Sequence, residues 1–257
     1  MRSTGSNVVT ILGALFLLFC ASGVILAQEA PNDTDPSKIV FFSLREEYYN
    51  LNGDGWINRV IYRSDKAIFK KSRFASPKGV TLRWDLPLVT THLGSETTTG
   101  LGDLYFHALF FPRFRKGLNL ALGPGLILPT ATDDLLGQGK WQIAPLAVPI
   151  WYFSKGRGFF LVKFQDFVSF AGDEERPDTH FLLTTPALFW RLNAKSWIVV
   201  DTEAQTDWKT DRTSVKSGLQ LGRTLTKQLA FWVKPEFYWG PNNQGDWGLK
   251  FTMLWIQ

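Results

Sequence analysis

Asp201 and Glu203 are two carboxylates that a β-strand would place on the same face. They lie in the segment SWIVVDTEAQTDW, and residues two positions apart in a strand share a face. Such a pair can perform general acid and base chemistry. Lys163, Lys216 and Lys234, on neighbouring predicted strands, could instead balance the two charges. We favour the second interpretation, in which the carboxylates belong to the wall of a water-filled pore.

The three histidines, His92, His107 and His180, do not suggest a catalytic or metal site. None has a serine two residues away that could share its face, and serine catalysis needs a nucleophile held by a base. The nearest candidate is His92 with Ser95, in a predicted loop. The histidines lie on different predicted strands without the spacing of zinc ligands. The sequence therefore predicts no catalytic, cofactor or metal residues, with a membrane-bound hydrolase as an alternative.

The segment around Asp201 alternates between an uncharged row and a polar row. Ile198, Val200 and Ala204 belong to the uncharged row, and a strand puts the two rows on opposite faces. Residues 79–92, 101–113, 214–226 and 229–239 alternate in the same way. The polar rows, with one lysine from a further segment, give ten candidate lumen residues: Arg83, Asp85, Asp103, His107, Lys163, Asp201, Glu203, Lys216, Lys234 and Glu236.

Twelve segments follow one another from Lys38 onward, each bounded by clusters of turn-forming residues. None shows a sustained helical period. They are long for soluble sheets and suit membrane barrels, in which about 9 to 11 residues cross the bilayer. They cover approximately residues 39–50, 56–68, 79–92, 101–113, 117–130, 141–153, 159–171, 179–192, 196–208, 214–226, 229–239 and 246–256.

A single sheet of twelve such strands has too many apolar rows for one soluble core. Closing the sheet, with apolar rows facing lipid and polar rows facing water inside, resolves this and removes the sheet edges. The sequence therefore predicts an all-β fold, a single antiparallel transmembrane β-barrel of about twelve strands. Three features oppose it. Segments 141–153 and 179–192 alternate poorly, Glu46 falls on the lipid face, and prolines lie in or beside strands at Pro87, Pro112, Pro124, Pro129, Pro145, Pro149, Pro186 and Pro235.

The N-terminus has the features of a secretory signal peptide. Arg2 precedes the apolar run VVTILGALFLLFCASGVILA, which ends at Ala27 before a polar segment. We predict a cleaved signal over residues 1–27, a flexible segment over 28–37 and the barrel over 38–257, with an anchoring helix as the alternative for the apolar run. Cleavage removes Cys20, the only cysteine, so disulfides are excluded from the mature chain. The scattered Lys and Arg residues, with a net charge of +5 before cleavage, do not form the basic footprint of nucleic-acid binding.

The predicted connections alternate between short, basic turns and longer, acidic loops, as in outer-membrane barrels. The short ones are residues 113–117, 154–158, 193–196 and 226–228, and the long ones are 93–100, 130–140, 172–179 and 207–213. The first turn, residues 69–79, is long and breaks the rule. We expect the loop over 130–140 to shape the external mouth.

Several motifs from Gly100 onward resemble those of a known family. They are GLGDL, LGPGLILPTATDDLLGQGKW, SFAGDEERPD and DWGLKF, at residues 100–104, 122–141, 169–178 and 246–251. These motifs are similar to those of bacterial outer-membrane proteins related to the phenol meta-pathway family, some of which carry the name neuromedin U. The resemblance implies an outer-membrane barrel, often described as a transporter, and supplies no catalytic residues. One departure is the end of the chain, LWIQ, where such barrels tend to finish on an aromatic residue.

We therefore predict an outer-membrane barrel that passes or binds small solutes by pore size and lumen electrostatics. The lipid of the outer membrane and a small solute are its expected partners, without a cofactor. The mixed signs of the candidate lumen residues predict weak ion selectivity. A closed structural or surface-binding barrel, filled by its own side chains, is a further alternative.

Overall fold

The computed structural model describes Thr34 and residues 42–68, 80–112 and 118–255. The predicted signal peptide, the segment 28–37 apart from Thr34, and the turns over 69–79 and 113–117 lie outside these ranges. Within them, no helix is both long and apolar enough to cross a membrane.

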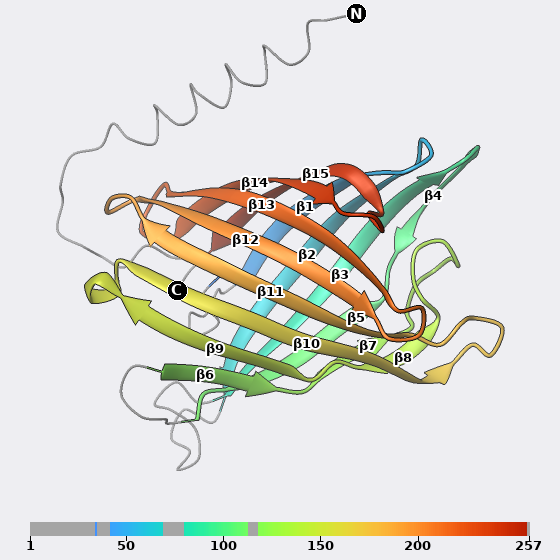
Figure 1. Cartoon of the computed structure of the whole chain (residues 1–257), viewed down its shortest axis with the longest axis horizontal. Helices are drawn as coiled ribbons and strands as arrows, with labels where there is room; N and C mark the ends of the chain where they lie inside the picture. Colours follow the sequence, from blue (N-terminus) through green and yellow to red (C-terminus); the bar gives the residue numbers. More distant parts are fainter. Residues whose placement is uncertain (1–33, 35–41, 69–79, 113–117, 256–257) are drawn as a thin grey trace, which may run out of the picture.

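Fifteen strand segments and one short 3-10 turn make up the described chain (Figure 1). The strands are β1 (Phe42–Leu51), β2 (Trp56–Ile68), β3 (Val80–Leu93), β4 (Glu96–Leu101), β5 (Leu104–Phe110), β6 (Leu118–Gly123), β7 (Gly125–Leu128), β8 (Lys140–Ile143), β9 (Leu146–Phe153), β10 (Gly158–Gly172), β11 (His180–Arg191), β12 (Ser196–Asp207), β13 (Arg212–Thr224), β14 (Leu229–Trp239) and β15 (Gly245–Trp255), and the turn is η1 (Ser154–Gly156).

The segments form twelve wall strands, because three of these strands are interrupted. β4 and β5 both pair with β3, β6 and β7 both pair with β5, and β8 and β9 both pair with β10. The sheet closes where β1 pairs with β15, with Phe42 opposite Trp255 and Tyr48 opposite Leu249. The prediction of a single antiparallel barrel of twelve strands is confirmed.

The interruptions accommodate two of the prolines, Pro124 and Pro145, whereas Pro87, Pro149, Pro186 and Pro235 lie within strands. Pro124 separates β6 from β7, and Pro145 separates β8 from β9. At each break the proline carbonyl still accepts a hydrogen bond from the adjacent strand of the sheet. Ala108 N–H donates to Pro124 O at 3.1 Å, and Asp166 N–H donates to Pro145 O at 3.1 Å. The chains approach closely here, since a Cβ on Gly123 would lie 1.7 Å from the Ala108 carbonyl oxygen. These two prolines therefore mark irregular points in the wall, as prolines at bulges do.

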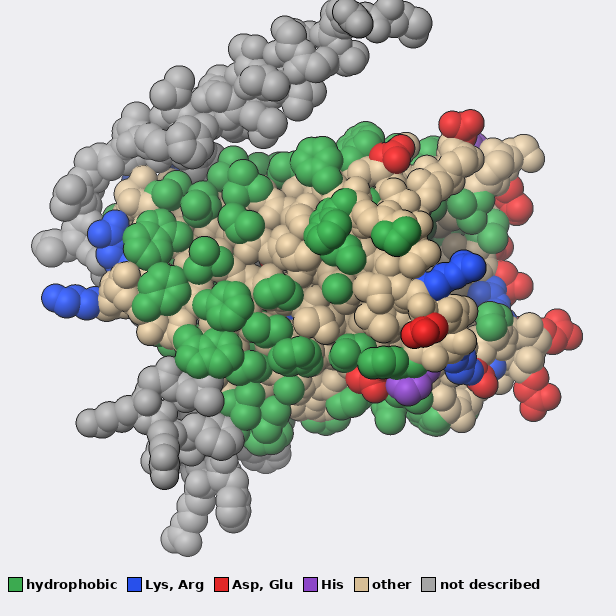
Figure 2. All heavy atoms as spheres, viewed as in Figure 1, with side chains coloured by type: hydrophobic (Ala, Val, Ile, Leu, Met, Phe, Trp, Pro, Cys, Tyr) green, Lys and Arg blue, Asp and Glu red, His purple; other side chains and the backbone are tan. Residues whose placement is uncertain are grey.

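The outer surface carries the apolar rows of the strands (Figure 2). Val200 is 49% exposed and Leu88 is 47% exposed, although both lie in the middle of long strands. Aromatic rings stack across neighbouring strands on this surface, as with Phe42 and Trp255 at 4.4 Å between centroids. Glu46 is also exposed, and it accepts a hydrogen bond of 3.1 Å from Asn58 Nδ2. An uncharged belt with one acidic exception covers the described wall around β1.

We call the two ends of the barrel the turn end and the loop end. The turn end carries η1 and the connections 192–195 and 225–228, and the loop end carries residues 129–139 and 173–179. Two long loops expected at the loop end are wrong. Residues 93–100 are mostly strand, since β3 runs to Leu93 and β4 starts at Glu96, and in 207–213 only the four-residue turn 208–211 lies between the end of β12 at Asp207 and the start of β13 at Arg212. Threonines opposite each other stabilise these extended hairpins, with 3.0 Å between the Oγ1 atoms of Thr90 and Thr99.

Candidate functional site

The interior contains an apolar layer near the turn end. Trp197, Phe189 and Leu254 are at most 1% exposed and belong to one cluster of buried side chains. Trp197 packs on the backbone of Gly222, its partner on β13, where a Cβ would lie 1.9 Å from the indole ring. The inward side chains therefore fill much of the barrel at this end.

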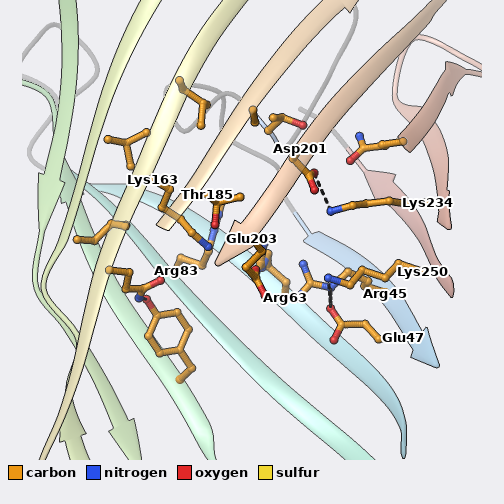
Figure 3. A pocket seen from close by; sticks show the side chains of 18 of the residues that line it. Arg45, Glu47, Arg63, Arg83, Lys163, Thr185, Asp201, Glu203, Lys234 and Lys250 are labelled. Atoms are coloured by element: carbon orange, nitrogen blue, oxygen red, sulfur yellow. Dashed lines mark hydrogen bonds and ion pairs between the residues drawn. The ribbon is translucent and has the colours of Figure 1, made fainter. Parts of the chain in front are cut away.

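A cavity of about 390 Å³ lies in the middle of the barrel (Figure 3). Its lining includes eight basic side chains, which are Arg45, Arg59, Arg63, Arg83, Lys163, Lys216, Lys234 and Lys250. Thr34 also lines it, so one residue that precedes the barrel in sequence lies inside the lumen. The size is within the range of about 300 to 1,000 Å³ typical of small-molecule sites.

The predicted acid pair lies in the cavity, and each carboxylate is bound by a lysine. Asp201 Oδ2 is 2.7 Å from Lys234 Nζ, and Glu203 Oε1 is 3.0 Å from Lys216 Nζ. Glu203 and Lys216 are direct cross-strand partners on β12 and β13. Both carboxylates are thus neutralised by lysines on β13 and β14, which favours the pore-wall interpretation over acid and base catalysis.

Glu236 joins these pairs into a network with β1 and β15. Its carboxylate is 2.9 Å from Lys234 Nζ, 3.2 Å from Lys250 Nζ and 3.7 Å from Lys216 Nζ. Lys250 Nζ lies a further 3.9 Å from Glu47, which is bound by Arg45 at 2.8 Å. The side chain of Glu236 is 1% exposed, so three lysines balance one deeply buried carboxylate.

A second group of ion pairs lies on β2 and β3. Arg63 binds both carboxylate oxygens of Asp85, at 2.7 and 2.5 Å, and Arg83 binds both oxygens of Asp65, at 2.6 and 2.6 Å. Each pair consists of residues directly opposite each other in the ladder. Two bidentate pairs therefore fix the geometry of this part of the wall.

The basic side chains around the cavity outnumber the acidic ones. The eight basic residues are met by six carboxylates, Glu47, Asp65, Asp85, Asp201, Glu203 and Glu236. Lys163 extends from β10 toward Glu203 (Figure 3), yet no ion pair joins it to a carboxylate in the described part of the chain. The cavity therefore has an excess of positive charge, and Lys163 and Arg59 are the two lining basic residues without an ion pair to a described carboxylate.

The histidines lie apart, as expected from the sequence. His107 is buried beside Tyr105, whose hydroxyl lies 2.9 Å from Nδ1 and also accepts a hydrogen bond from Gln165. His92 bonds to Thr97 at 2.7 Å and stacks on Trp56, and His180 Nε2 is 3.3 Å from Asp166 Oδ2. Among the described residues, no cluster of three or more His, Cys, Asp or Glu side chains could hold a metal ion.

Asp103 has a different position from the other candidate residues. Its carboxylate accepts hydrogen bonds from Ala131 N–H at 3.1 Å and Gln138 N–H at 2.7 Å, so it holds the loop 129–139 rather than lining the cavity. Arg176 ties the same loop to 173–179, with hydrogen bonds of 2.8 Å to Gly137 O and 2.5 Å to Asp134 O. The loop expected over 130–140 is therefore anchored at the loop end.

The ten candidate residues thus fall into three groups. Arg83, His107, Lys163, Asp201, Glu203, Lys216 and Lys234 line the cavity, Asp85 and Glu236 bind residues of its lining, and Asp103 holds a loop. Their role in solute passage stays a prediction.

The sequence reasoning missed six charged residues of the cavity region: Arg45, Glu47, Arg59, Arg63, Asp65 and Lys250. A signal was present, because Arg45 and Glu47, like Arg63 and Asp65, are two residues apart on predicted strands. The charge of Glu46 on the opposite face masked this alternation in β1.

Comparisons with known proteins support the fold. Neither the family models nor the curated proteins gave a match to this sequence. Among solved structures, the COG4313 outer membrane channel from Pseudomonas putida F1 is similar with a TM-score of 0.70 and 11% identity, covering 90% of this chain and 100% of that one. The KdgM porin in complex with disordered oligogalacturonate (TM-score 0.57, 8% identity) and the NanC porin (TM-score 0.56, 8% identity) each align with 84% of this chain, over 99% and 100% of their own. The chain therefore has the fold of bacterial outer-membrane β-barrels.

Proposed function

We propose that this protein is a bacterial outer-membrane channel that passes or binds small anionic solutes. The mainly apolar belt on the outer surface supports insertion in a membrane, and short turns at one end with longer loops at the other match the periplasmic and external sides of such barrels. The motifs that resemble those of proteins related to the phenol meta-pathway family support the same assignment.

The excess of basic side chains around the cavity carries the preference for anions. Eight basic residues face six carboxylates, and a ring of unbalanced charge in a narrow lumen raises the local concentration of ions of opposite sign. The KdgM porin, of the same fold, was solved with an acidic oligosaccharide, which is compatible with this preference.

The reversal potential of the refolded protein in a planar bilayer under a KCl gradient tests the proposal. We expect a modest preference for chloride over potassium, which decreases in Lys163→Gln. Lys227→Gln, in an exposed turn at the turn end, is the matched control and should leave the reversal potential unchanged. A cation preference, or an equal effect of both substitutions, would contradict the assignment.

A closed barrel is the second candidate, and the apolar layer favours it. Trp197, Phe189 and Leu254 fill the interior near the turn end. Heat-shifted gel migration reports folding independently of conductance. A folded barrel without measurable current in the wild type, but with current in Trp197→Ala, would indicate a channel closed by this layer.

A further inference from the structure

The wall of the cavity is not uniformly charged. Leu146 and Val148 on β9 and Leu161 on β10 present apolar side chains to it. In the closed order of twelve strands, β9 and β10 lie six positions from β15 and β1, which places them diametrically opposite. Arg45, Glu47 and Lys250, on β1 and β15, line the opposite wall, where two basic groups flank one carboxylate (Figure 3). An apolar wall therefore faces a charged wall that is positive on balance.

The two kinds of surface meet at Lys163. Leu161 and Lys163 are two residues apart on β10, so both point inward. The side chain of Lys163 starts next to Leu161 on β10 and extends toward Glu203 (Figure 3), and no ion pair neutralises its ammonium group among the described residues. This position can pair with an anionic group while the body of the same ligand lies on the apolar patch of Leu146, Val148 and Leu161.

The physical chemistry of such a surface favours one class of ligand. A hydroxyl pressed against leucine or valine loses water without gaining a partner, whereas an apolar group in the same place gains from burial. A carboxylate gains from a lysine that lacks another partner. The cavity of about 390 Å³ has room for a small molecule of this kind.

We propose that the preferred solute is a small amphipathic monoanion, a carboxylate on an aromatic or aliphatic body, bound with its charge at Lys163 and its body against Leu146, Val148 and Leu161. The proposal rests on the anion channel proposed above and specifies its substrate class. A hydroxylated sugar acid has the same charge but lacks the apolar body, so it is the natural competitor.

Cyclohexanecarboxylate and glucuronate form a suitable pair of probes, since both are six-membered-ring monocarboxylates and only the second carries hydroxyl groups. Each is added to the refolded protein in a planar bilayer while the chloride current is recorded. We expect cyclohexanecarboxylate to halve the current at a concentration at least about tenfold lower than glucuronate does. Isothermal titration calorimetry of the detergent-folded protein gives the same comparison without any current.

Val148→Thr tests the apolar wall with a small change of volume. It should reduce the preference for cyclohexanecarboxylate several-fold, whereas Lys163→Gln should weaken the binding of both probes. Val200→Thr, the same substitution on the lipid-facing surface, is the matched control and should keep the wild-type ratio. The comparison in the wild type needs no substitution, so it stands even if a variant does not refold.

The outcomes separate this inference from the function on which it rests. Equal affinity for the two probes, or tighter binding of glucuronate, in a barrel that prefers chloride would overturn the amphipathic ligand and leave the anion channel intact. Absence of current together with tighter calorimetric binding of cyclohexanecarboxylate would overturn the open channel and support the site. Absence of binding of both probes would overturn the site itself.

Discussion

Glu203 and Lys216 face each other directly across β12 and β13, with 3.0 Å between Glu203 Oε1 and Lys216 Nζ. Lys216 also lies 4.8 Å from the centre of the Tyr49 ring on β1, on the far side of β14 and β15. One lysine thus links its own cross-strand partner to a strand near the start of the barrel. The charged side chains of the lumen act as a connected network rather than as separate pairs.

Glu203→Gln should destabilise the barrel by about 1–3 kcal/mol, because it leaves the half-buried Lys216 with less compensating charge. Urea unfolding followed by tryptophan fluorescence measures the change. Glu96→Gln, at an exposed hairpin tip, is the control. Glu203→Gln should also increase the preference for chloride, since it removes one negative charge from the cavity. A loss of anion preference in Glu203→Gln would be inconsistent with the proposed electrostatics.

Asp103→Ala should release the loop 129–139, because the backbone N–H groups of Ala131 and Gln138, which donate hydrogen bonds to this carboxylate, lose their acceptor. A decrease of about 1–2 kcal/mol in the free energy of local opening corresponds to roughly a tenfold increase in the rate at which an Asp-specific protease cleaves the Asp133 to Leu135 segment. Asp246→Ala, an exposed carboxylate at the same end, should leave the cleavage rate unchanged. Equal rates in both variants would show that Asp103 does not hold the loop.

The pKa of the Asp178 carboxyl, in the loop 173–179, is held below its usual value. A hydrogen bond from Lys140 is the main cause, followed by the positive charges of Lys140 and Lys209, at 3.1 and 3.5 Å. Because the folded pKa is the lower one, this tie stabilises the loop above the ordinary aspartate pKa and is lost as the pH falls through the folded value.

Lys140→Gln should therefore raise the pKa of Asp178, and Lys209→Gln should raise it by less. A carbon-13 NMR titration of the aspartate carboxyl groups measures both effects. Lys195→Gln, in a turn at the opposite end, is the control. A pKa that stays constant in Lys140→Gln would refute the assigned cause.

Glu46→Leu combined with Asn58→Leu should stabilise the barrel in lipid vesicles, because polar side chains on the lipid face are unfavourable. We expect about 1 kcal/mol or more in the urea-induced unfolding free energy. Glu96→Leu provides the control at the loop end. Destabilisation by the double substitution would instead indicate that Glu46 and Asn58 make a stabilising contact on the outer face.

Much of the architecture follows from local patterns. Alternation placed Val200 outward and Asp201 inward, and the turn residues marked twelve strands within a few residues. The extended hairpins at 93–100 and 207–213 escaped this reasoning, because Thr97, Thr99 and Thr213 were assigned to loops for their polarity. Their β-branched side chains pair across the ladder instead.

The sequence by itself determined that this protein is a barrel of twelve strands with a charged interior, since the two-residue period of a strand is a local property. Only the tertiary structure decided which charges meet. Glu47 and Lys250 approach to 3.9 Å although they lie near opposite ends of the barrel sequence, because β1 closes on β15. It also decided that Leu161 and Lys163 face the charged wall of β15 and β1, since that depends on closure and register across the whole sheet.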